Sequence, residues 1–403
     1  MNKHLKTNPA APQEPQGRIA FWRQPLGLVL IFLYFAASIV IITPSVKELI
    51  DGAVSGDPEI VGHDYRVFYA AGTLTNAKKF DTLYDAHKFE NTDFKYVERW
   101  QHFSYPPTIL LLFAPLSKLS YIQAFALWAG LSAIALILTT YLISKSYLVV
   151  AMVMISPLFW RGVFTGQTGL ITATLMGCGL YALWRNKPVI SGISFGLLII
   201  KPHLALALPL CLLITRDWKV MLSGIATVAI TIAISYLAFG VEAWQAFFHG
   251  MGGSIASEIP GEINNVISLT FWNITLFITK SMTIAGIVAA LGTIFALYIT
   301  VYIWRNTTDI APRAVSLILL PAFASPYFHL YDAVPLLIVF SLMARDLLYK
   351  KTAPYAGLMM LTIWVFSFAV FRTQLFTFYV LPFIFLIGLN LLAYVQTKES
   401  IKS

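Results

Sequence analysis

The run Leu26-Gly-Leu-Val-Leu-Ile-Phe-Leu-Tyr-Phe-Ala-Ala-Ser-Ile-Val-Ile-Ile-Thr43 decides the class of fold to which this chain belongs. It carries no charge and approaches the roughly 20 apolar residues that cross a bilayer core of about 30 Å. It is longer than the apolar core of a signal peptide, and no small-residue cleavage site follows it. Four basic residues precede it: Lys3, Lys6, Arg18 and Arg23. We therefore predict an uncleaved first membrane span.

Composition extends this prediction to the whole chain. Hydrophobic residues make up 58% of the 403 positions and charged residues only 12%, which is more apolar side chain than one soluble core needs. We expect an all-α polytopic membrane protein. The formal charge of +9 comes from basic residues scattered between apolar runs, a pattern typical of cytoplasmic loops and unlike a nucleic-acid-binding surface. Nucleic acid is therefore excluded as a partner.

Motifs of soluble enzymes are missing. The sequence contains no Walker loop, no Gly-x-Ser-x-Gly and no zinc-type spacing of His and Cys. Its two cysteines, Cys178 and Cys211, lie inside apolar runs and are expected to be packed thiols. Soluble nucleotide chemistry and a disulfide framework are therefore excluded.

Basic residues order the turns between the apolar runs. Those on alternate turns are Lys145, Arg185 with Lys187, Arg216 with Lys219, Arg305 with Arg313, and Arg345 with Lys350 and Lys351. The positive-inside rule places these turns in the cytoplasm. Residues 106–119 are too short for a comfortable span, and we interpret them as a re-entrant or surface helix.

On this accounting about twelve helices cross the membrane, and both termini are cytoplasmic. The predicted spans are 24–43, 121–142, 147–160, 167–184, 189–200, 203–215, 218–240, 283–304, 312–324, 332–344, 355–371 and 375–394. Several hold only about a dozen apolar residues, which indicates a deep, water-filled cavity. Lys201-Pro202-His203 and Ser325-Pro326 are expected to line it, because irregular backbone at membrane depth needs protein or water around it.

The chain is predicted to form one transmembrane domain, 21–395. A disordered cytoplasmic tail, 1–20, precedes it, and a second cytoplasmic tail, 396–403, follows it. The first external loop, 44–105, contains most of the carboxylates of the chain.

Short surface helices are predicted inside that loop, over residues 65–75 and 86–100. Aromatic and aliphatic residues alternate there with charges, as in helices that lie along a membrane. No internal repeat is evident along the chain, which weighs against a secondary transporter.

Asp64 lies in the polar stretch Gly62-His-Asp-Tyr-Arg-Val-Phe-Tyr69 of the external loop. Two interpretations are open. As the cap of a short helix, its carboxylate would accept a backbone N–H and contribute about 1 kcal/mol. As a general base, it would take a proton from a membrane-dissolved substrate.

Lys201 stands between an apolar run and Pro202, where a helix must break. An intramembrane lysine is costly and usually functional. Its ammonium either reaches the outer interface along its aliphatic stem or, with His203, contacts the phosphate of a lipid-linked substrate. Arg161 and Arg372 are predicted on the same side, each as a further phosphate contact or as a lipid-headgroup anchor.

Polar and aromatic residues in three other segments are candidates for contacts to an acceptor or a sugar. They are His102, Tyr105, Gln167, His329, Tyr331 and Asp332. The residues from 325 to 332 equally suit an interfacial aromatic belt, and Gln167 equally suits a helix cap.

An ordered series of short motifs runs through the chain. They are Asp64-Tyr65-x-x-Phe68-Tyr69-x-Ala71-Gly72, Leu83-Tyr84-Asp85, Tyr105-Pro106-Pro107 with Leu112-x-x-Pro115-Leu116, Gly166-Gln167 and Lys201-Pro202. This order, over roughly residues 24–345, resembles glycosyltransferase family 87, whose members have the GT-C fold and use polyprenyl-phosphate sugars. Ser325-Pro326 with His329 resembles the family's pattern more loosely.

The resemblance implies a GT-C-type bundle and an inverting membrane glycosyltransferase. It would move a sugar, with mannose as the first expectation, from a polyprenyl-phosphate donor to a lipid or glycan acceptor on the outer face. Asp64 matches the acidic residue of the family's first external loop and is the expected catalytic base. Lys201, His203 and Arg161 would bind the donor phosphate. Arg66 stands where an Asp-x-Asp metal site would need a second acid, so no obligatory metal and no cofactor are expected.

The expected partners are the lipid-linked donor, the acceptor and membrane lipids. The expected location is the bacterial inner (plasma) membrane, with a role in the cell envelope. A transporter or flippase of lipid-linked glycans is the alternative function. It would also have a wet cavity with basic residues, but would place its charges near mid-membrane at a repeat interface.

Overall fold

The structure is a computed structural model that describes residues 25–56, 61–92, 103–261, 270–325, 327–349, 355–371 and 387–398. Within these ranges the elements are all helices, which confirms the all-α fold class. Apolar runs form helices because a helix bonds its backbone N–H and C=O groups to one another, and lipid offers them no other partner. The predicted tails, 1–20 and 396–403, lie wholly or mostly outside the described residues.

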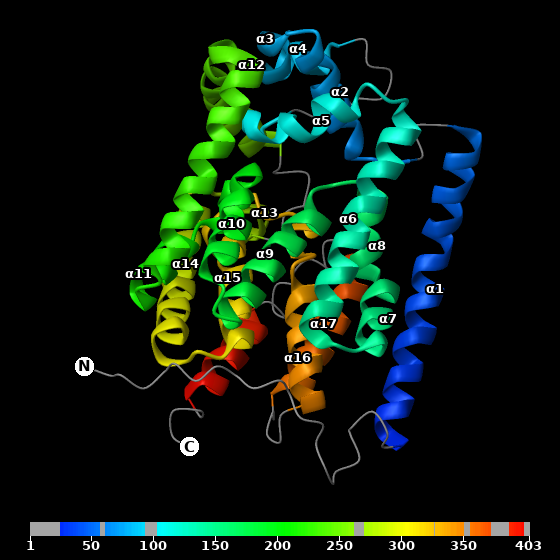
Figure 1. Ribbon diagram of the computed structural model, residues 1–403, viewed down its shortest axis with the longest axis vertical. Coiled ribbons are helices and arrows are strands. Elements are labelled where there is room, and N and C mark those ends of the chain that lie inside the picture. Colours follow the sequence, from blue (N-terminus) through cyan, green and yellow to red (C-terminus); the bar gives the residue numbers. More distant parts are fainter. Residues whose placement is uncertain are drawn as a thin grey trace.

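Short turns join most successive helices within the described residues (Figure 1). They are α1 (Pro25–Ser55), α2 (Tyr65–Asn76), α3 (Phe80–Tyr84), α4 (Ala86–Glu90), η2 (Pro107–Ile109), α5 (Leu110–Leu116), α6 (Tyr121–Ser144), α7 (Tyr147–Ile155), α8 (Pro157–Thr165), α9 (Gly169–Trp184), α10 (Pro188–Gly196), η3 (Leu197–Ile200), η4 (Pro202–Ala205), α11 (Leu208–Thr215), α12 (Trp218–Gly261), α13 (Phe271–Thr279), α14 (Met282–Asn306), α15 (Ile310–Ala324), η5 (Leu330–Ala333), α16 (Leu336–Tyr349) and α17 (Ala356–Phe371). Residues 387–398 are also helical.

Among the described residues, four helices are long and apolar enough to cross a membrane. They are Gly27–Ser55, Tyr121–Ser144, Trp218–Gly250 and Met282–Asn306, and a fifth span results if α7 and α8, which meet at 57°, are one broken span. Exposed apolar side chains on these helices, such as Phe32 and Leu237, suit contact with lipid. The chain is therefore an integral membrane protein. The expected count of about twelve spans is not confirmed, since the shorter apolar helices have 10–17 residues.

One predicted helix end is wrong. α1 does not end at residue 43 but continues through Pro44 to Ser55. Helix α1 continues past Pro44 because a proline removes only one backbone N–H donor. Val46 and Ile50 continue the apolar face of the helix beyond it. A kink at Gly240, whose φ of 78° and ψ of 178° are non-helical, interrupts α12 at the predicted end of the span 218–240, and helical residues continue from there to Gly261.

The helix predicted over 65–75 is confirmed as α2, whereas only Ala86–Glu90 of the second predicted surface helix is described as helical. α2, α3, α4 and α5 lie together at one end of the bundle, beside the distal end of α12 (Figure 1). α2 packs closely on α5: Phe68 stacks on Phe113 with ring centroids 4.5 Å apart. This cap of short helices positions the segment that contains Asp64.

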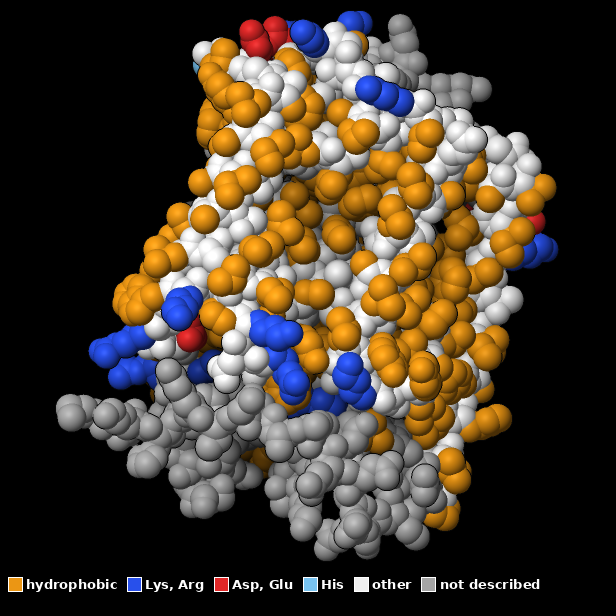
Figure 2. All heavy atoms as spheres, viewed as in Figure 1, with side chains coloured by type: hydrophobic (Ala, Val, Ile, Leu, Met, Phe, Trp, Pro, Cys, Tyr) orange, Lys and Arg blue, Asp and Glu red, His pale blue; other side chains and the backbone are white. Residues whose placement is uncertain are grey.

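Figure 2 shows Lys and Arg side chains at both ends of the bundle, with the larger group at the end opposite α2–α5. The exposed members of this larger group include Lys145, Arg185, Lys187, Arg216 and Lys219, all from turns predicted to be cytoplasmic.

Arg313 and Arg345, assigned to the same turns, are instead buried. The guanidinium of Arg313 lies 4.8 Å from the ring of Trp304, and that of Arg345 lies 4.2 Å from the ring of Trp184. Arginine tolerates such burial because its planar cation stacks on aromatic faces.

Candidate functional site

Asp64 sits at the start of α2, but it does not cap the helix. Its side chain makes no capping hydrogen bond, so the cap interpretation is wrong. The carboxylate is 22% exposed, and its Oδ1 lies 3.5 Å from Nδ1 of His63. The backbone N–H of Asp64 donates to the carbonyl of Thr165 at 3.1 Å. This bond fixes Asp64 against the turn that joins α8 to α9.

That turn is built on Gly166, whose φ is +64°. The indole N–H of Trp128 donates to the Gly166 carbonyl at 2.9 Å. The next residue, Gln167, is buried, and its Oε1 accepts the Tyr105 hydroxyl at 3.0 Å. The Gly166-Gln167 motif therefore holds Tyr105 beside the segment that contains Asp64.

Substituting Gly166 by Ala should destabilise the protein. A left-handed conformation costs a non-glycine residue about 1–2 kcal/mol, and the new Cβ would lie 2.7 Å from Cβ of Tyr65. We expect a lower Tm for the detergent-solubilised variant. Gly130→Ala is the matched control, because a Cβ at Gly130 meets nothing within 4 Å and its Tm should not fall. Equal Tm values for the two variants would contradict this role of Gly166.

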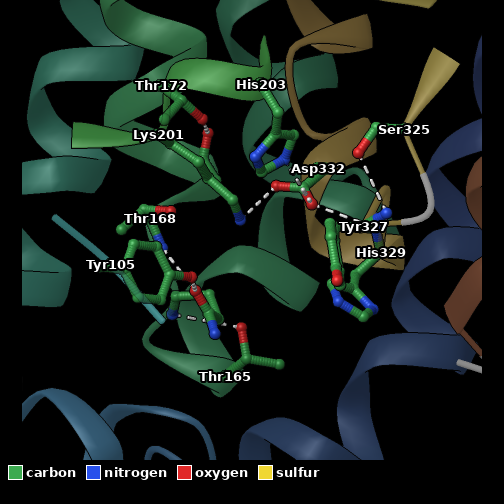
Figure 3. A network of polar contacts seen from close by, with 12 residues as sticks. Tyr105, Thr165, Thr168, Thr172, Lys201, His203, Ser325, Tyr327, His329 and Asp332 are labelled. Atoms are coloured by element: carbon green, nitrogen blue, oxygen red, sulfur yellow. Dashed lines mark hydrogen bonds and ion pairs between the residues drawn. The ribbon is translucent and has the colours of Figure 1, made fainter. Parts of the chain in front are cut away.

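The second part of the site forms where two helix breaks meet (Figure 3). Lys201 lies between η3 and η4, and Asp332 lies in η5. Nζ of Lys201 lies 2.6 Å from Oδ1 of Asp332, and the two side chains are only 5% and 0% exposed. The pair therefore joins segments that are 131 positions apart in the sequence.

Other predicted residues surround this pair. Oδ2 of Asp332 accepts the backbone N–H of His329 at 3.0 Å and lies 3.9 Å from Nε2 of His203. The ring centroid of Tyr331 is 4.4 Å from the Lys201 ammonium, and that of Tyr105 is 5.6 Å away.

The 2.6 Å separation of Lys201 Nζ and Asp332 Oδ1 suits a pair of opposite charges. Burial raises the pKa of Asp332, but the Lys201 ammonium and the His203 side chain outweigh burial and hold that pKa well below its usual value. Burial lowers the pKa of Lys201, whereas Asp332 and Tyr105 raise it, and the net pKa is above its usual value. Both residues lie outside the candidate spans.

Tyr105 connects the two parts of the site. Burial raises the pKa of its phenol, Lys201 lowers it, and Asp332 and Asp64 raise it further. The backbone N–H of Asp64 bonds to Thr165, two residues before the Gln167 that accepts the Tyr105 hydroxyl, and the Tyr105 ring lies 5.6 Å from the Lys201 ammonium. The structure thus brings together Asp64, Tyr105, Gln167, Lys201, His203, His329, Tyr331 and Asp332.

In the described part of the chain, no hydrogen bond or ion pair joins the Arg161 side chain to this group. Arg161 lies in α8 with its buried Nε lacking a hydrogen-bond partner in the described part of the chain. His102 and Arg372 lie outside the described residues. Within the described ranges, no group of three or more His, Cys, Asp or Glu side chains could hold a metal ion, and metal independence stays a prediction.

The ion pair itself was missed from the sequence. The sequence predicts Lys201 as a contact to the donor phosphate and Asp332 as a contact to the acceptor or sugar. Neither prediction pairs the two residues with each other. A signal was available, because charged residues between apolar runs tend to pair with one another and both residues stand beside helix breaks.

Comparison with known proteins gives one family. The sequence model described as glycosyltransferase family 87 matches residues 103–326, more than half of the chain. The matched region includes Tyr105, Gln167 and Lys201, but neither Asp64 nor Asp332. Searches of curated proteins and of solved structures gave no match.

Proposed function

From the premise that the chain belongs to glycosyltransferase family 87 and is a membrane glycosyltransferase, we propose that its donor is a polyprenyl-phosphate sugar. The sugar is mannose, and the acceptor is a lipid or a glycan. One observation carries the proposal. The Asp64 carboxylate is partly exposed and caps no helix, and its backbone N–H bonds to Thr165 in the turn whose Gln167 accepts the Tyr105 hydroxyl beside the Lys201 ammonium.

Asp64 acts as the general base. The acceptor hydroxyl oxygen attacks the anomeric carbon while the bond from that carbon to the phosphate oxygen breaks. The hydroxyl proton passes to the Asp64 carboxylate, and the electron pair of the broken bond leaves with the phosphate. Because attack and departure occur on opposite faces, the configuration inverts. Proton transfer by a positioned side chain contributes about 10²- to 10⁴-fold to such a rate.

Lys201 stabilises the departing phosphate. Its ammonium is a fixed positive charge in a site from which water is largely excluded, where electrostatic stabilisation is strongest. His203, on the other oxygen of Asp332, and Arg161, in α8, are further candidates for phosphate contacts. Gln167, Tyr105, His329, Tyr331, Asp332 and His102 are the proposed surroundings of the sugar and acceptor. No step requires a metal or another cofactor.

The reaction takes place on the outer face of a bacterial inner membrane. The larger group of exposed Lys and Arg side chains lies at the end of the bundle opposite α2–α5, and the positive-inside rule assigns that end to the cytoplasm (Figure 2). Asp64, at the start of α2, then faces outside, and both termini are cytoplasmic.

The polyprenyl chain of the donor lies along α1. A groove of about 410 Å³ is lined almost wholly by aliphatic side chains of α1 and by Ile155 at the end of α7. The α1 residues are Ile39, Ile42, Thr43, Val46, Lys47 and Ile50. An isoprenoid chain suits this lining better than a sugar does.

Val46→Trp should raise KM for a long-chain donor and leave KM for a short-chain donor unchanged. Displacing two CH₂ groups, at roughly 0.8 kcal/mol each, corresponds to about a tenfold change. Leu237→Trp, at an 83% exposed position of α12, is the matched control and should change neither value. An equal rise in KM for both donors would show that the polyprenyl chain does not bind in this groove.

The function itself is tested by incubating purified protein with a panel of polyprenyl-phosphate sugars and an acceptor, with and without a chelator. We expect consumption of the mannose donor, release of polyprenyl phosphate, and no effect of the chelator. Movement of intact donor across vesicles without cleavage of the sugar-phosphate bond would instead indicate the flippase.

A further inference from the structure

The carboxylate of Asp332 is fixed by the turn to which it belongs. Its Oδ2 accepts the backbone N–H of His329, and the backbone N–H of Asp332 donates to the His329 carbonyl at 2.9 Å. Asp332 has a short side chain and is fully buried. The Asp332 carboxylate therefore has a fixed position, and its charge holds the end of the long Lys201 side chain in place.

Two aromatic rings also contact the ammonium that Asp332 holds. Tyr331 comes from the same turn, η5, and Tyr105 precedes η2 at the capped end of the bundle. An ammonium over aromatic faces is stabilised by the ring quadrupole. Lys201 thus has a defined location between the Tyr105–Gln167 pair and the η5 turn (Figure 3).

Stability alone does not account for this arrangement. A buried ion pair contributes little relative to apolar residues of similar size. The chain contains a second buried pair, Arg345–Asp346, at 2.9 Å, between adjacent residues of α16. Of these two pairs, the Lys201–Asp332 pair is the one that joins distant segments, and its ammonium lies beside the Tyr105 ring.

We propose that Asp332 is a positioning residue that fixes the Lys201 ammonium where the phosphate departs. This inference rests on the proposed function. Because the resting pair is neutral, it attracts the singly charged donor phosphodiester only weakly. The leaving phosphate gains negative charge as its bond to the sugar breaks, so the ammonium interacts more strongly with the transition state than with the bound donor.

Asp332→Asn tests the proposal, because it keeps the shape of the side chain and removes its charge. We expect kcat to fall by about 100-fold, the size of effect that a 1 Å misplacement can have.

The pH profile provides a readout that a purely structural role would not change. The groups acting on the Lys201 ammonium are Asp332 and Tyr105, with the Tyr331 ring against it and His203 on the far oxygen of Asp332. Without the carboxylate, burial lowers the pKa of Lys201. The alkaline limb of the kcat profile should therefore move to lower pH by about 1–3 units.

Asp346→Asn is the matched control, since it breaks the other buried pair. Its kcat and pH profile should remain those of the wild type, whatever happens to its Tm. If Asp332→Asn does not fold, Asp332→Glu replaces it. That variant keeps the charge and shifts the ammonium, so kcat should fall by about tenfold while the alkaline limb stays in place.

The outcomes separate the two proposals. Asp332→Asn, or Asp332→Glu in its place, with wild-type kcat and an unshifted alkaline limb would overturn the positioning role, while an inactive Asp64→Asn would leave the proposed function standing. A wild-type protein that consumes no polyprenyl-phosphate sugar would overturn both.

Discussion

Asp64→Asn is expected to abolish sugar transfer while the protein still inserts into the membrane and folds. The substitution preserves the shape of the side chain and removes the proton acceptor, so the rate should fall by about 10²- to 10⁴-fold. The Asp64 carboxylate makes no capping hydrogen bond that the amide would lose, so Tm should change little. The measurement is kcat with the mannose donor, together with Tm in detergent.

Asp81→Asn is the control for this experiment. Asp81 is an exposed acid in α3, at the same end of the bundle, and its substitution should leave kcat unchanged. A fully active Asp64→Asn variant would show that Asp64 is not the base, because the asparagine amide cannot accept the hydroxyl proton.

Lys201→Met is expected to lose both stability and transfer. It leaves the Asp332 carboxylate buried without its ammonium, and removing one partner of a buried pair costs about 3–5 kcal/mol. Loss of the charge at the departing phosphate should reduce kcat by about 10²- to 10³-fold, as for other preorganised electrostatic groups. Tm and kcat of the purified variant measure the two effects.

The double variant Lys201→Met/Asp332→Asn separates stability from catalysis. Removing the second charge should restore much of the lost Tm, because no uncompensated charge stays buried. Transfer should stay lost, since the ammonium is still absent. Recovery of transfer together with Tm would show that Lys201 serves only the fold.

The sequence predicts the local features of the fold well. The first span and α2 appear where apolar runs and alternating polarity indicate them, because these patterns record which side of each helix meets lipid or protein. Helix ends are predicted less well. Pro44 looks like a terminator, yet α1 continues past it, whereas α12 is interrupted at Gly240 as predicted.

The candidate site shows the same division. Asp64, Lys201 and Asp332 are each conspicuous as charges in an apolar chain, and sequence alone selects them. Their partners depend on how the bundle closes. Arg313 and Arg345 were assigned to cytoplasmic turns by counting charges, but their cations lie over tryptophan rings in the interior.

The sequence by itself therefore determined the membrane class, the helical fold, the family resemblance and the residues that could take part in catalysis or binding. These follow from composition and from short motifs, which are local properties of the chain. Only the tertiary structure decided that Asp64 caps nothing, that Gln167 holds Tyr105, and that Lys201 is paired with Asp332. The physical reason is that a buried charge is stable only beside its counter-ion, and residues 131 positions apart become neighbours only when the helices between them pack.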